Sequence, residues 1–555
     1  MEVISVKEFC MYSTVKIANP KIIFNSIAVL IVAVGFAGCK QKPQTAGPQP
    51  KLDSLSVINY FKSDPQLKGD LVWAKQFYYE HGYELGWFKD HKPLAQVNKL
   101  LTVIKKAGEE GLNPETYKVR DFDKLFKELE AAKKDTAERN KLEKEIDLSL
   151  SGTYFKWASD YYRGIVIPKE NRDVEWDVKR NKIKLHKALL SVLGTRDSKY
   201  PYAEFKPLHP EYERLRLALA KYREIAAAGG WPKLPETGLK PNDNSASVAA
   251  LRKRLAVEGQ ANVYNDTLVA AVKNFQEQNG LKPTGKVSAE TAKLLNIPVQ
   301  QRIKQIIINM ERWRWIPKDF GQDFFMVNIP EYTLRVYEKG KQAMKMKVIV
   351  GKTMNSTPIF SDMLEYVVLA PYWNVPFNIV KEEYAEKFSN DPSLVEQLNM
   401  EVIDNNENPV DPASIDWTSL DESSFKYILR KKPGPKNDLG NVKFIFPNKN
   451  NVYLHDTPHD ELFTQEKRGF SHGCVRVEKP VELAEYLLRK IPGWNRSQIM
   501  STIALNEEKF VALKQKIPVY LVYFTAWADD AGNVHFREDI YGHDQGLINK
   551  YFAKL

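Results

Sequence analysis

The spacing of apolar residues predicts that the first part of the chain is mostly helical. From Leu55 to about Gly229, apolar side chains recur every three or four residues, most clearly in Leu148–Ile165 and Tyr212–Ala227. This period places them along one face of a helix. We therefore expect a helical scaffold domain over residues 53–240.

A smaller group of helices is predicted next, over residues 241–298. Its apolar residues fall on short helical faces that can pack into one core. They are Val248, Leu251, Leu255, Val272, Phe275, Leu281, Leu294 and Leu295. The pattern predicts a small three-helix module after the scaffold.

The period changes to two beyond Gln300, where apolar and polar residues alternate. Such alternation is typical of strands with one buried face. The predicted strands are Phe324–Ile329, Thr333–Tyr337, Lys345–Val350, Tyr366–Leu369, Val442–Phe446, Val452–Leu454, Val519–Tyr523 and Val534–Phe536. We expect a β-rich domain over residues 299–555, which makes the whole a multidomain α+β protein.

One stretch of the β-rich domain loses the alternation. Residues 381–420 are rich in acidic residues, asparagine and proline. Long interruptions of this kind inside a compact domain are usually functional. We interpret the stretch as an insertion that covers one end of the sheet and acts as a lid.

Composition limits the classes of function. The chain has 555 residues, 43% hydrophobic and 27% charged, which is typical of a globular protein with several cores. Its formal net charge of +11 suits an anionic polymer or a membrane surface. The basic residues are spread along the chain without a zinc-finger, helix-turn-helix or RNA-binding pattern, so nucleic acid is not an expected partner.

The N-terminus has the pattern of an export signal. Lys16 and Lys21 precede an apolar run, Ser26–Ala37, that is short for a bilayer-spanning helix of about 20 residues. We expect a cleaved signal peptide at residues 1–38. An uncleaved transmembrane anchor over Ile22–Ala37 is the alternative, and both place the rest of the chain outside the cytoplasm.

The end of this run indicates how the protein is held at a membrane. Phe36-Ala37-Gly38-Cys39 resembles the lipobox of bacterial lipoproteins, in which the cysteine becomes the lipidated first residue. We expect a lipid on Cys39 and a flexible tether over residues 39–52. The expected location is the periplasmic side of the cell envelope, anchored to a membrane.

The cysteine count isolates one thiol. Of three cysteines, Cys10 lies in the leader and Cys39 is the expected lipid site, which leaves Cys474 alone. No disulfide can form within the mature chain. A solitary cysteine is either an inert buried thiol or a reactive one, and its neighbours decide which.

Two histidines are candidate partners of Cys474. His455 is followed, after fifteen residues, by Ser471-His472-Gly473-Cys474-Val475-Arg476-Val477. If that segment is extended, His472, Cys474 and Arg476 share one face while the two valines enter the core. An imidazole within reach of a thiol raises its thiolate fraction and later returns the proton. Spacing alone does not choose between the two histidines.

This pattern resembles the active-site signature of the L,D-transpeptidase catalytic domain, in which a histidine is followed, after about fifteen residues, by Ser-His-Gly-Cys. The resemblance implies that Cys474 is the nucleophile, that His455 is the general base, oriented by a backbone carbonyl, and that His472 shapes the pocket and assists. It extends over most of the mature chain, to large periplasmic members with a helical scaffold and a glycan-binding module. Further stretches that support it are Gly229-Gly230-Trp231-Pro232, Asn309–Trp315, Pro371–Pro376, Gly434–Asn437, Leu439-Gly440 and Thr525-Ala526-Trp527.

The family's reaction implies attack by Cys474 on the bond between the third and fourth residues of a peptidoglycan stem tetrapeptide, with release of D-alanine. The side-chain amine of an acceptor stem, expected to be diaminopimelate, then resolves the thioester into a 3-3 crosslink while His455 accepts its proton. The resemblance also implies that carbapenems acylate Cys474. The family uses no cofactor and no metal.

Several neighbours are candidates for binding substrate or the developing oxyanion. Backbone N–H groups near Gly473 and Cys474 would hold the oxyanion, with Tyr453 as a further contributor. Arg476 stands where many smaller family members carry asparagine, and we hypothesise that it orients a substrate carboxylate. Ser471 is the remaining candidate for substrate binding.

The three-helix module also resembles a known unit. Val272–Leu281, followed by Thr284-Gly285-Lys286-Val287 and Thr291, is similar to the helical peptidoglycan-binding module of wall enzymes. The resemblance implies glycan as a partner, beside the stem peptides. A structural spacer that keeps the fold without binding glycan is the alternative.

Other interpretations use the same residues. Water in place of the amine would give an L,D-carboxypeptidase or endopeptidase, and an inactive catalytic domain would leave a wall-binding scaffold. His455, Asp456 and His459 could imitate a zinc site. Tryptophans 313, 315 and 373 are expected in cores rather than as sugar platforms. Other wall-synthesis proteins are further candidate partners.

Overall fold

A computed structural model describes residues 48–168, 176–177, 183–194, 209–234, 238–259, 262–317 and 319–553. The expected signal peptide, Cys39 and the tether up to residue 47 lie outside the described residues. Among the helices within those ranges, none has an apolar stretch long enough to cross a bilayer.

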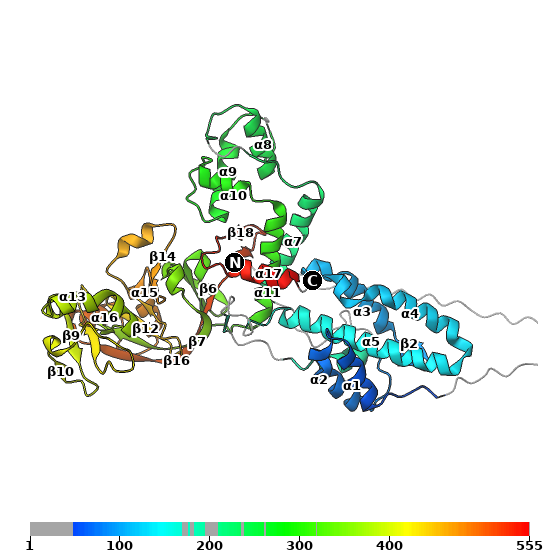
Figure 1. The fold of residues 1–555 in the computed structure, drawn as a ribbon. Coiled ribbons are helices and arrows are strands. Elements are labelled where there is room, and N and C mark those ends of the chain that lie inside the picture. The colour runs from blue at the N-terminus through cyan, green and yellow to red at the C-terminus, as the bar shows by residue number, and fades with distance from the viewer. Residues whose placement is uncertain are drawn as a thin grey trace, which may run out of the picture. The chain divides into compact units, whose positions relative to one another are not determined.

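The scaffold region is helical, as its periodicity predicted (Figure 1). Its long helix begins at Asp135, whose carboxylate accepts hydrogen bonds from the N–H groups of Ala137 and Glu138. A short hairpin, β1 (Phe88–Lys89) and β2 (Lys92–Pro93), interrupts the helices. The helices are α1 (Ser54–Ser63), α2 (Leu71–Glu80), α3 (Ala95–Lys105), α4 (Val119–Ala131), α5 (Thr136–Arg163), α6 (Leu185–Gly194) and α7 (Pro210–Ala227).

The predicted three-helix module is confirmed as α8 (Ala246–Leu255), α9 (Asp266–Gln278) and α10 (Ala289–Leu295). Each helix starts at a side-chain oxygen that accepts from a backbone N–H of the first turn. The caps are Ser245, Asn265 and Ser288. Of the eight apolar residues predicted to form the core, only Leu281 stands outside the cluster.

Helix α11 (Val299–Trp315) joins these helical regions to the β-rich domain. Arg314 donates to the Glu110 carbonyl oxygen at 2.6 Å. Arg312 lies 2.5 Å from the carboxylate of Asp544 in the C-terminal helix α17 (His543–Ala553). Both arginine side chains are buried, so each needs the partner that it has. Trp313 and Trp315 are buried in the same core, as predicted.

The β-rich domain is built on one long sheet. Its strand order is β12-β13-β15-β6-β5-β4-β16-β7-β3, and a further pairing of β12 with β7 closes the first eight strands on themselves. Most neighbours are antiparallel, while β13 with β15, β4 with β16, β6 with β14 and β3 with β7 are parallel. The strands are β3 (Trp176–Asp177), β4 (Phe324–Asn328), β5 (Thr333–Glu338), β6 (Lys341–Gly351), β7 (Ile359–Leu369), β12 (Val442–Ile445), β13 (Leu454–His455), β14 (Gly469–Ser471), β15 (Val475–Val477) and β16 (Lys509–Val522).

Further elements complete this domain. Helices α15 (Pro480–Leu488) and α16 (Arg496–Ala504) follow β15, and β17 (Ala526–Ala528) pairs with β18 (Val534–Phe536). All eight predicted strands have a counterpart, although the run predicted at Val452 begins only at Leu454.

The stretch that loses alternation folds into a small unit with its own sheet, ordered β10-β9-β11-β8 (Figure 1). Its strands are too short for alternation to show, and the unit extends beyond the predicted residues 381–420 at both ends. Its elements are β8 (Trp373–Asn374), α12 (Phe377–Ile379), a π-helix (Val380–Tyr384), α13 (Ala385–Asn390), α14 (Leu394–Gln397), β9 (Met400–Ile403), β10 (Pro409–Val410) and β11 (Ile428–Lys431). A separate apolar cluster forms its core, and we call this unit the insert.

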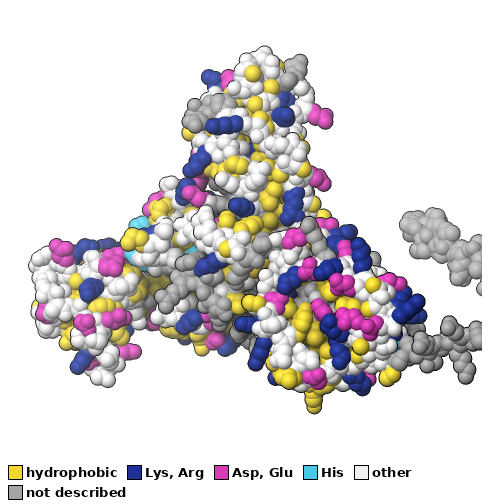
Figure 2. Space-filling view, turned by 45° about the vertical axis from the view of Figure 1, so that its right-hand side comes forward, with side chains coloured by type: hydrophobic (Ala, Val, Ile, Leu, Met, Phe, Trp, Pro, Cys, Tyr) yellow, Lys and Arg dark blue, Asp and Glu magenta, His cyan; other side chains and the backbone are white. Residues whose placement is uncertain are grey.

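The charged side chains do not gather on one face. Figure 2 shows Lys and Arg side chains interspersed with Asp and Glu over the surface in view. This agrees with a basic excess spread along the chain.

One buried carboxylate of the scaffold, that of Asp70, should make the stability of the protein depend on pH. Asp70 is 6% exposed, and burial, followed by repulsion from Asp160, raises the pKa of Asp70 to about 7. The neutral acid therefore contributes stability that is full below the ordinary pKa and is lost as the pH rises through about 7. We predict that Asp70→Asn raises the free energy of unfolding by roughly 2–4 kcal/mol at about pH 8 and has little effect at about pH 4.

Urea unfolding at the two pH values measures this difference. Asp64→Asn is the matched control, because Asp64 pairs with Lys118 at the surface and its pKa is lowered. The control should not stabilise at either pH. Equal stabilisation by Asp70→Asn at both pH values would contradict the buried-charge explanation.

Candidate active site

The candidate base stands on β13, next to the parallel strand β15, which begins directly after the candidate nucleophile. In the pairing of β13 with β15, Leu454 lies opposite Val475 and His455 lies opposite Arg476. Leu454 and Val475 are fully buried in the core. Because side chains alternate between the two faces of a strand, His455 and Arg476 share the opposite face, and the charge of Arg476 acts on the Cys474 thiol.

Cys474 itself lies in a bend between two strands. β14 ends at Ser471 and β15 begins at Val475. Between them Gly473 has φ +116°, a conformation that favours glycine. The condition considered from the sequence, that the whole motif is extended, is therefore not met, and strand alternation does not place His472 on the face of Cys474. The buried positions predicted for the two valines of β15 are confirmed.

Ser471 holds this bend together. Its hydroxyl donates to the Cys474 carbonyl oxygen at 2.5 Å and accepts from the Gly473 N–H at 3.2 Å. Thr357 donates to the Gly473 carbonyl oxygen at 2.8 Å. Ser471 is 2% exposed, so its hydroxyl fixes the bend rather than facing substrate. The Gly473 N–H is engaged and is not an oxyanion donor here; the Cys474 N–H has no hydrogen-bond partner in the described part of the chain.

His455 is oriented by a backbone carbonyl. The ring is 4% exposed, and Nδ1 donates to the Asp456 carbonyl oxygen at 2.5 Å. This bond keeps a proton on Nδ1 and leaves Nε2 as an acceptor. Burial, and then the charges of Arg476 and Lys443, lower the pKa of His455 to about 3. Near neutral pH the ring is uncharged and able to take a proton.

Asp456 is fixed in turn. Its carboxylate accepts from the N–H groups of Asn441 and Thr457, each at 2.7 Å. A Cβ on Gly440 would lie 2.3 Å from the Asp456 carboxyl carbon, so this approach requires glycine.

His459, one of the three residues that could imitate a zinc site, lies 3.3 Å from Glu461. Among the described residues, no group of three His, Cys, Asp or Glu side chains is placed to hold a metal ion.

The thiol of Cys474 rests in its neutral form. Its Sγ lies 3.8 Å from the Asn451 carbonyl oxygen, to which the S–H donates. Burial raises the pKa of Cys474, and hydrogen bonds from Tyr453 and the charges of Lys443 and Arg476 only partly oppose the rise. The site therefore combines a neutral thiol with a neutral imidazole, so the proton moves as the sulfur attacks.

Lys443 is a further candidate site residue, which sequence reasoning missed. It lies opposite His455 in the pairing of β12 with β13, and its Nζ lies 4.0 Å from the centre of the Tyr453 ring. In the part of the chain that is described, no carboxylate forms an ion pair with it. In the sequence, the alternation of apolar and polar residues shows that Lys443, between Val442 and Phe444, points away from the core. Only the strand pairing brings Lys443 to the same site as the thiol.

Arg476 is half-buried near the same thiol. Its Nε is shielded from solvent and has no hydrogen-bond partner among the described residues. Burial lowers the pKa of Arg476, while Asp438 and Cys474 oppose that change. A buried donor without a partner is costly unless a ligand satisfies it, and an anionic group fits a guanidinium.

The insert contributes two side chains to this region. The Trp373 indole acts on the Tyr453 hydroxyl and partly opposes the rise in its pKa. Glu383, on the π-helix, lies 2.9 Å from Nε2 of His472. Burial raises the pKa of Tyr453, so its hydroxyl stays protonated. The structure thus brings His472 to the insert, rather than to the strand face of Cys474.

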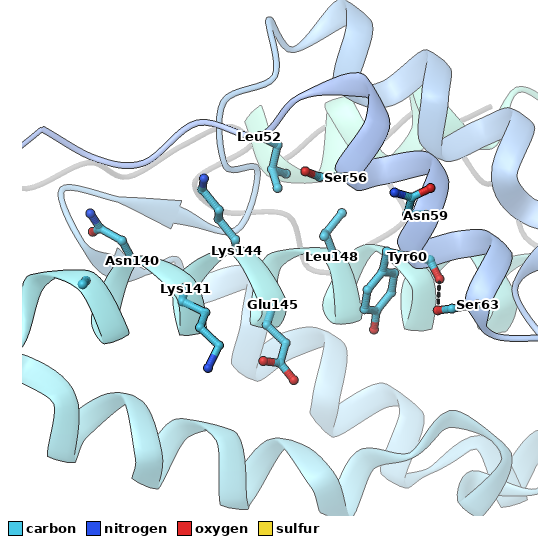
Figure 3. A pocket seen from close by; sticks show the side chains of 11 residues that line it. Leu52, Ser56, Asn59, Tyr60, Ser63, Asn140, Lys141, Lys144, Glu145 and Leu148 are labelled. Atoms are coloured by element: carbon cyan, nitrogen blue, oxygen red, sulfur yellow. Dashed lines mark hydrogen bonds between the residues drawn. The ribbon is translucent and has the colours of Figure 1, made fainter.

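A groove of about 670 Å3 lies elsewhere, between α1 and α5 of the scaffold (Figure 3). In Figure 3 its lysine, asparagine and serine side chains lie along the rim, with Leu148 and Tyr60 between the helices. Its lining contains no histidine or cysteine, so it lacks a nucleophile with its base. The lining residues are Leu52, Ser56, Asn59, Tyr60, Ser63, Ala137, Asn140, Lys141, Lys144, Glu145 and Leu148.

Three regions of the chain match known protein families. Residues 322–499 match the L,D-transpeptidase catalytic domain. Residues 244–295 match a family described as "Putative peptidoglycan binding domain", and residues 73–219 match a family described as "Scaffold domain". The first of these matches contains the whole constellation around Cys474.

Individual relatives agree with this assignment. The chain is 39% identical over 244 residues to a Haemophilus influenzae protein named "Putative L,D-transpeptidase", covering 44% of this chain and about half, 49%, of that relative. A Mycobacterium smegmatis L,D-transpeptidase structure is 13% identical, with a TM-score of 0.16 over 36% of this chain and 58% of that one. A structure of an L,D-transpeptidase from Xylanimonas cellulosilytica is 14% identical, with a TM-score of 0.17, and the match covers 52% of this chain and 100% of that one. Such low TM-scores carry no argument. The matches therefore assign residues 322–499 to the family of L,D-transpeptidase catalytic domains, preceded in this chain by regions similar to a scaffold domain and to a peptidoglycan-binding domain.

Proposed function

We propose that this protein crosslinks peptidoglycan stem peptides through a thioester at Cys474. The observation that carries the proposal is the pairing of β13 with β15, which joins the strand of His455, protonated on Nδ1, to the strand that begins directly after Cys474. The match of residues 322–499 supports the class of reaction. The match of residues 244–295 supports peptidoglycan as the substrate.

The first half-reaction transfers the donor stem to the enzyme. Sγ of Cys474 attacks the carbonyl carbon between the third and fourth residues of the donor tetrapeptide, while Nε2 of His455 takes the thiol proton. The imidazolium then protonates the leaving amine as the C–N bond breaks. D-alanine leaves, and a C–S bond holds the donor as a thioester.

Negative charge develops on the attacked carbonyl oxygen. The Cys474 N–H and the Tyr453 hydroxyl are the proposed hydrogen-bond donors, since the Gly473 N–H is engaged by Ser471. Lys443 and Arg476 supply positive charge in a partly buried site, where it acts more strongly than in water. Arg476 would also orient a substrate carboxylate through its unpaired Nε.

The second half-reaction forms the crosslink. The side-chain amine of an acceptor stem, of the diaminopimelate type, attacks the thioester carbonyl. His455 Nε2 takes a proton from the attacking nitrogen and returns it to the sulfur as the C–S bond breaks. The product is a 3-3 crosslink, and the thiol is restored. Water at the same step would give the tripeptide instead.

The proposal places this chemistry in the cell envelope. The apolar run before Cys39 supports export, and a lipid on Cys39 would hold the protein on the periplasmic side of a membrane. The three-helix module would bind glycan near the catalytic domain. The insert would act as a lid over the site, where it already contacts His472 and Tyr453.

The direct test uses purified disaccharide-tetrapeptide and mass spectrometry of the products. We predict that the wild-type protein forms 3-3 dimers and releases D-alanine, whereas Cys474→Ala forms neither. Tripeptide monomer without dimer would show a carboxypeptidase instead. Equal products from both proteins would contradict the assignment of the nucleophile.

A second prediction concerns the charge of Lys443. Removing a preorganised charge from the oxyanion region typically slows acylation, and we expect Lys443→Met to slow it roughly ten- to a hundredfold. Carbapenem acylation of Cys474, followed by intact-protein mass spectrometry, measures this half-reaction alone.

Lys443→Arg is the matched control, because it keeps the positive charge on β12. It should retain most of the acylation rate. Equal loss in the Met and Arg variants would show that the lysine matters for packing rather than for charge.

A further inference from the structure

The contact between the insert and the nucleophile loop suggests a role beyond covering the site. Glu383 lies on a π-helix, a rare element that occurs frequently at functional sites. Its carboxylate lies 2.9 Å from Nε2 of His472, which precedes Cys474 by two residues. Both side chains keep solvent access, at 41% and 31% exposed. A ligand can therefore reach them.

Their charges differ from those that surround the thiol. Lys443 and Arg476 make the strand face around Cys474 positive, which suits anionic groups of the donor. Glu383 is a carboxylate at the exposed edge of the same site. The second substrate of the proposed reaction is an amine, which is a cation near neutral pH. An exposed negative side chain in contact with the residue two before Cys474 therefore suits a cationic second substrate.

We propose that Glu383 and His472 form the acceptor-amine subsite, an inference that rests on the proposed function. The Glu383 carboxylate binds the acceptor ammonium and accepts the Nε2–H of His472. With its proton held on Nε2, His472 presents Nδ1 as a base. Glu383 is thus an acceptor-binding residue supplied by the insert, and the ligand class is a primary ammonium.

The proton balance of the second half-reaction follows from this arrangement. An ammonium has no lone pair, so it must lose one proton before it attacks. His472 Nδ1 takes that proton, and Glu383 stabilises the resulting imidazolium. The neutral amine then attacks the thioester carbonyl, and its second proton passes through His455 to the departing sulfur. His472 finally returns its proton to solvent.

The test separates the donor step from the acceptor step. The donor is an isotope-labelled disaccharide-tetrapeptide, and the acceptor is an unlabelled disaccharide-tripeptide, which lacks the bond that is cleaved. The D-alanine released in the first turnover reports acylation, and the dimer with one labelled stem reports transfer. Both are measured while the acceptor concentration is varied, for the wild-type protein, Glu383→Gln and Glu382→Gln.

Glu383→Gln removes the charge but keeps an oxygen that can accept from His472. We expect D-alanine release within about twofold of wild type, while the acceptor concentration for half-maximal dimer rises about tenfold, the usual scale for one charge-assisted contact. Glu382→Gln removes a neighbouring exposed carboxylate of the same π-helix and should behave as wild type.

Three outcomes would overturn the inference. An unchanged acceptor dependence in Glu383→Gln would show that the carboxylate does not bind the amine. If Glu383→Gln lowered D-alanine release and dimer formation by the same factor, Glu383 would be a structural contact of the insert and not an acceptor-binding residue. Wild-type protein that releases D-alanine without any dimer would overturn the proposed transfer as well, because no acceptor amine would then be used.

Discussion

The parallel pairing of two short strands is the constraint on which the site depends. β13 carries His455 and β15 continues from Cys474, and their register is fixed because Leu454 and Val475 are both buried in the core. A slip by one residue would turn every side chain of a strand to the other face. The core that stabilises the sheet therefore also aligns the base with the nucleophile. Ser471 and Gly473 then shape the bend that presents the thiol.

Burial sets the chemistry of that aligned pair. It disfavours charge on both partners, so the pKa of Cys474 is raised while that of His455 is lowered. Lys443 and Arg476 do not ionise the resting thiol, but they stand ready for the charge that appears during attack. The insert adds side chains of its own at the edge, where Glu383 meets His472. One site thus combines a positive face for the donor with a negative edge for an amine.

Much of this arrangement could be predicted from the sequence, and the remainder has identifiable physical causes. A long periodic segment such as Tyr212–Ala227 shows its structure because one face of the helix is buried. The short strands of the insert could not be seen, since β9 and β10 offer too few residues for a period. The bend at Gly473 was missed because the motif also fits an extended strand. Lys443 and Glu383 come to the thiol and to His472 only through contacts distant in sequence, which no local pattern reveals.

The central claim is that the site rests as a neutral thiol beside a neutral imidazole, and a thiolate titration tests it most directly. The ultraviolet absorbance of the thiolate would be followed against pH in the protein without residues 1–39, which hold Cys10 and Cys39, with Cys474→Ala as the blank. Because Cys474 is then the only cysteine, the difference belongs to it. The account predicts no thiolate signal near pH 7 and a rise only above the usual pKa of a thiol, about 8.5. A full thiolate signal at pH 7 would contradict it, because the resting site would then be an ion pair.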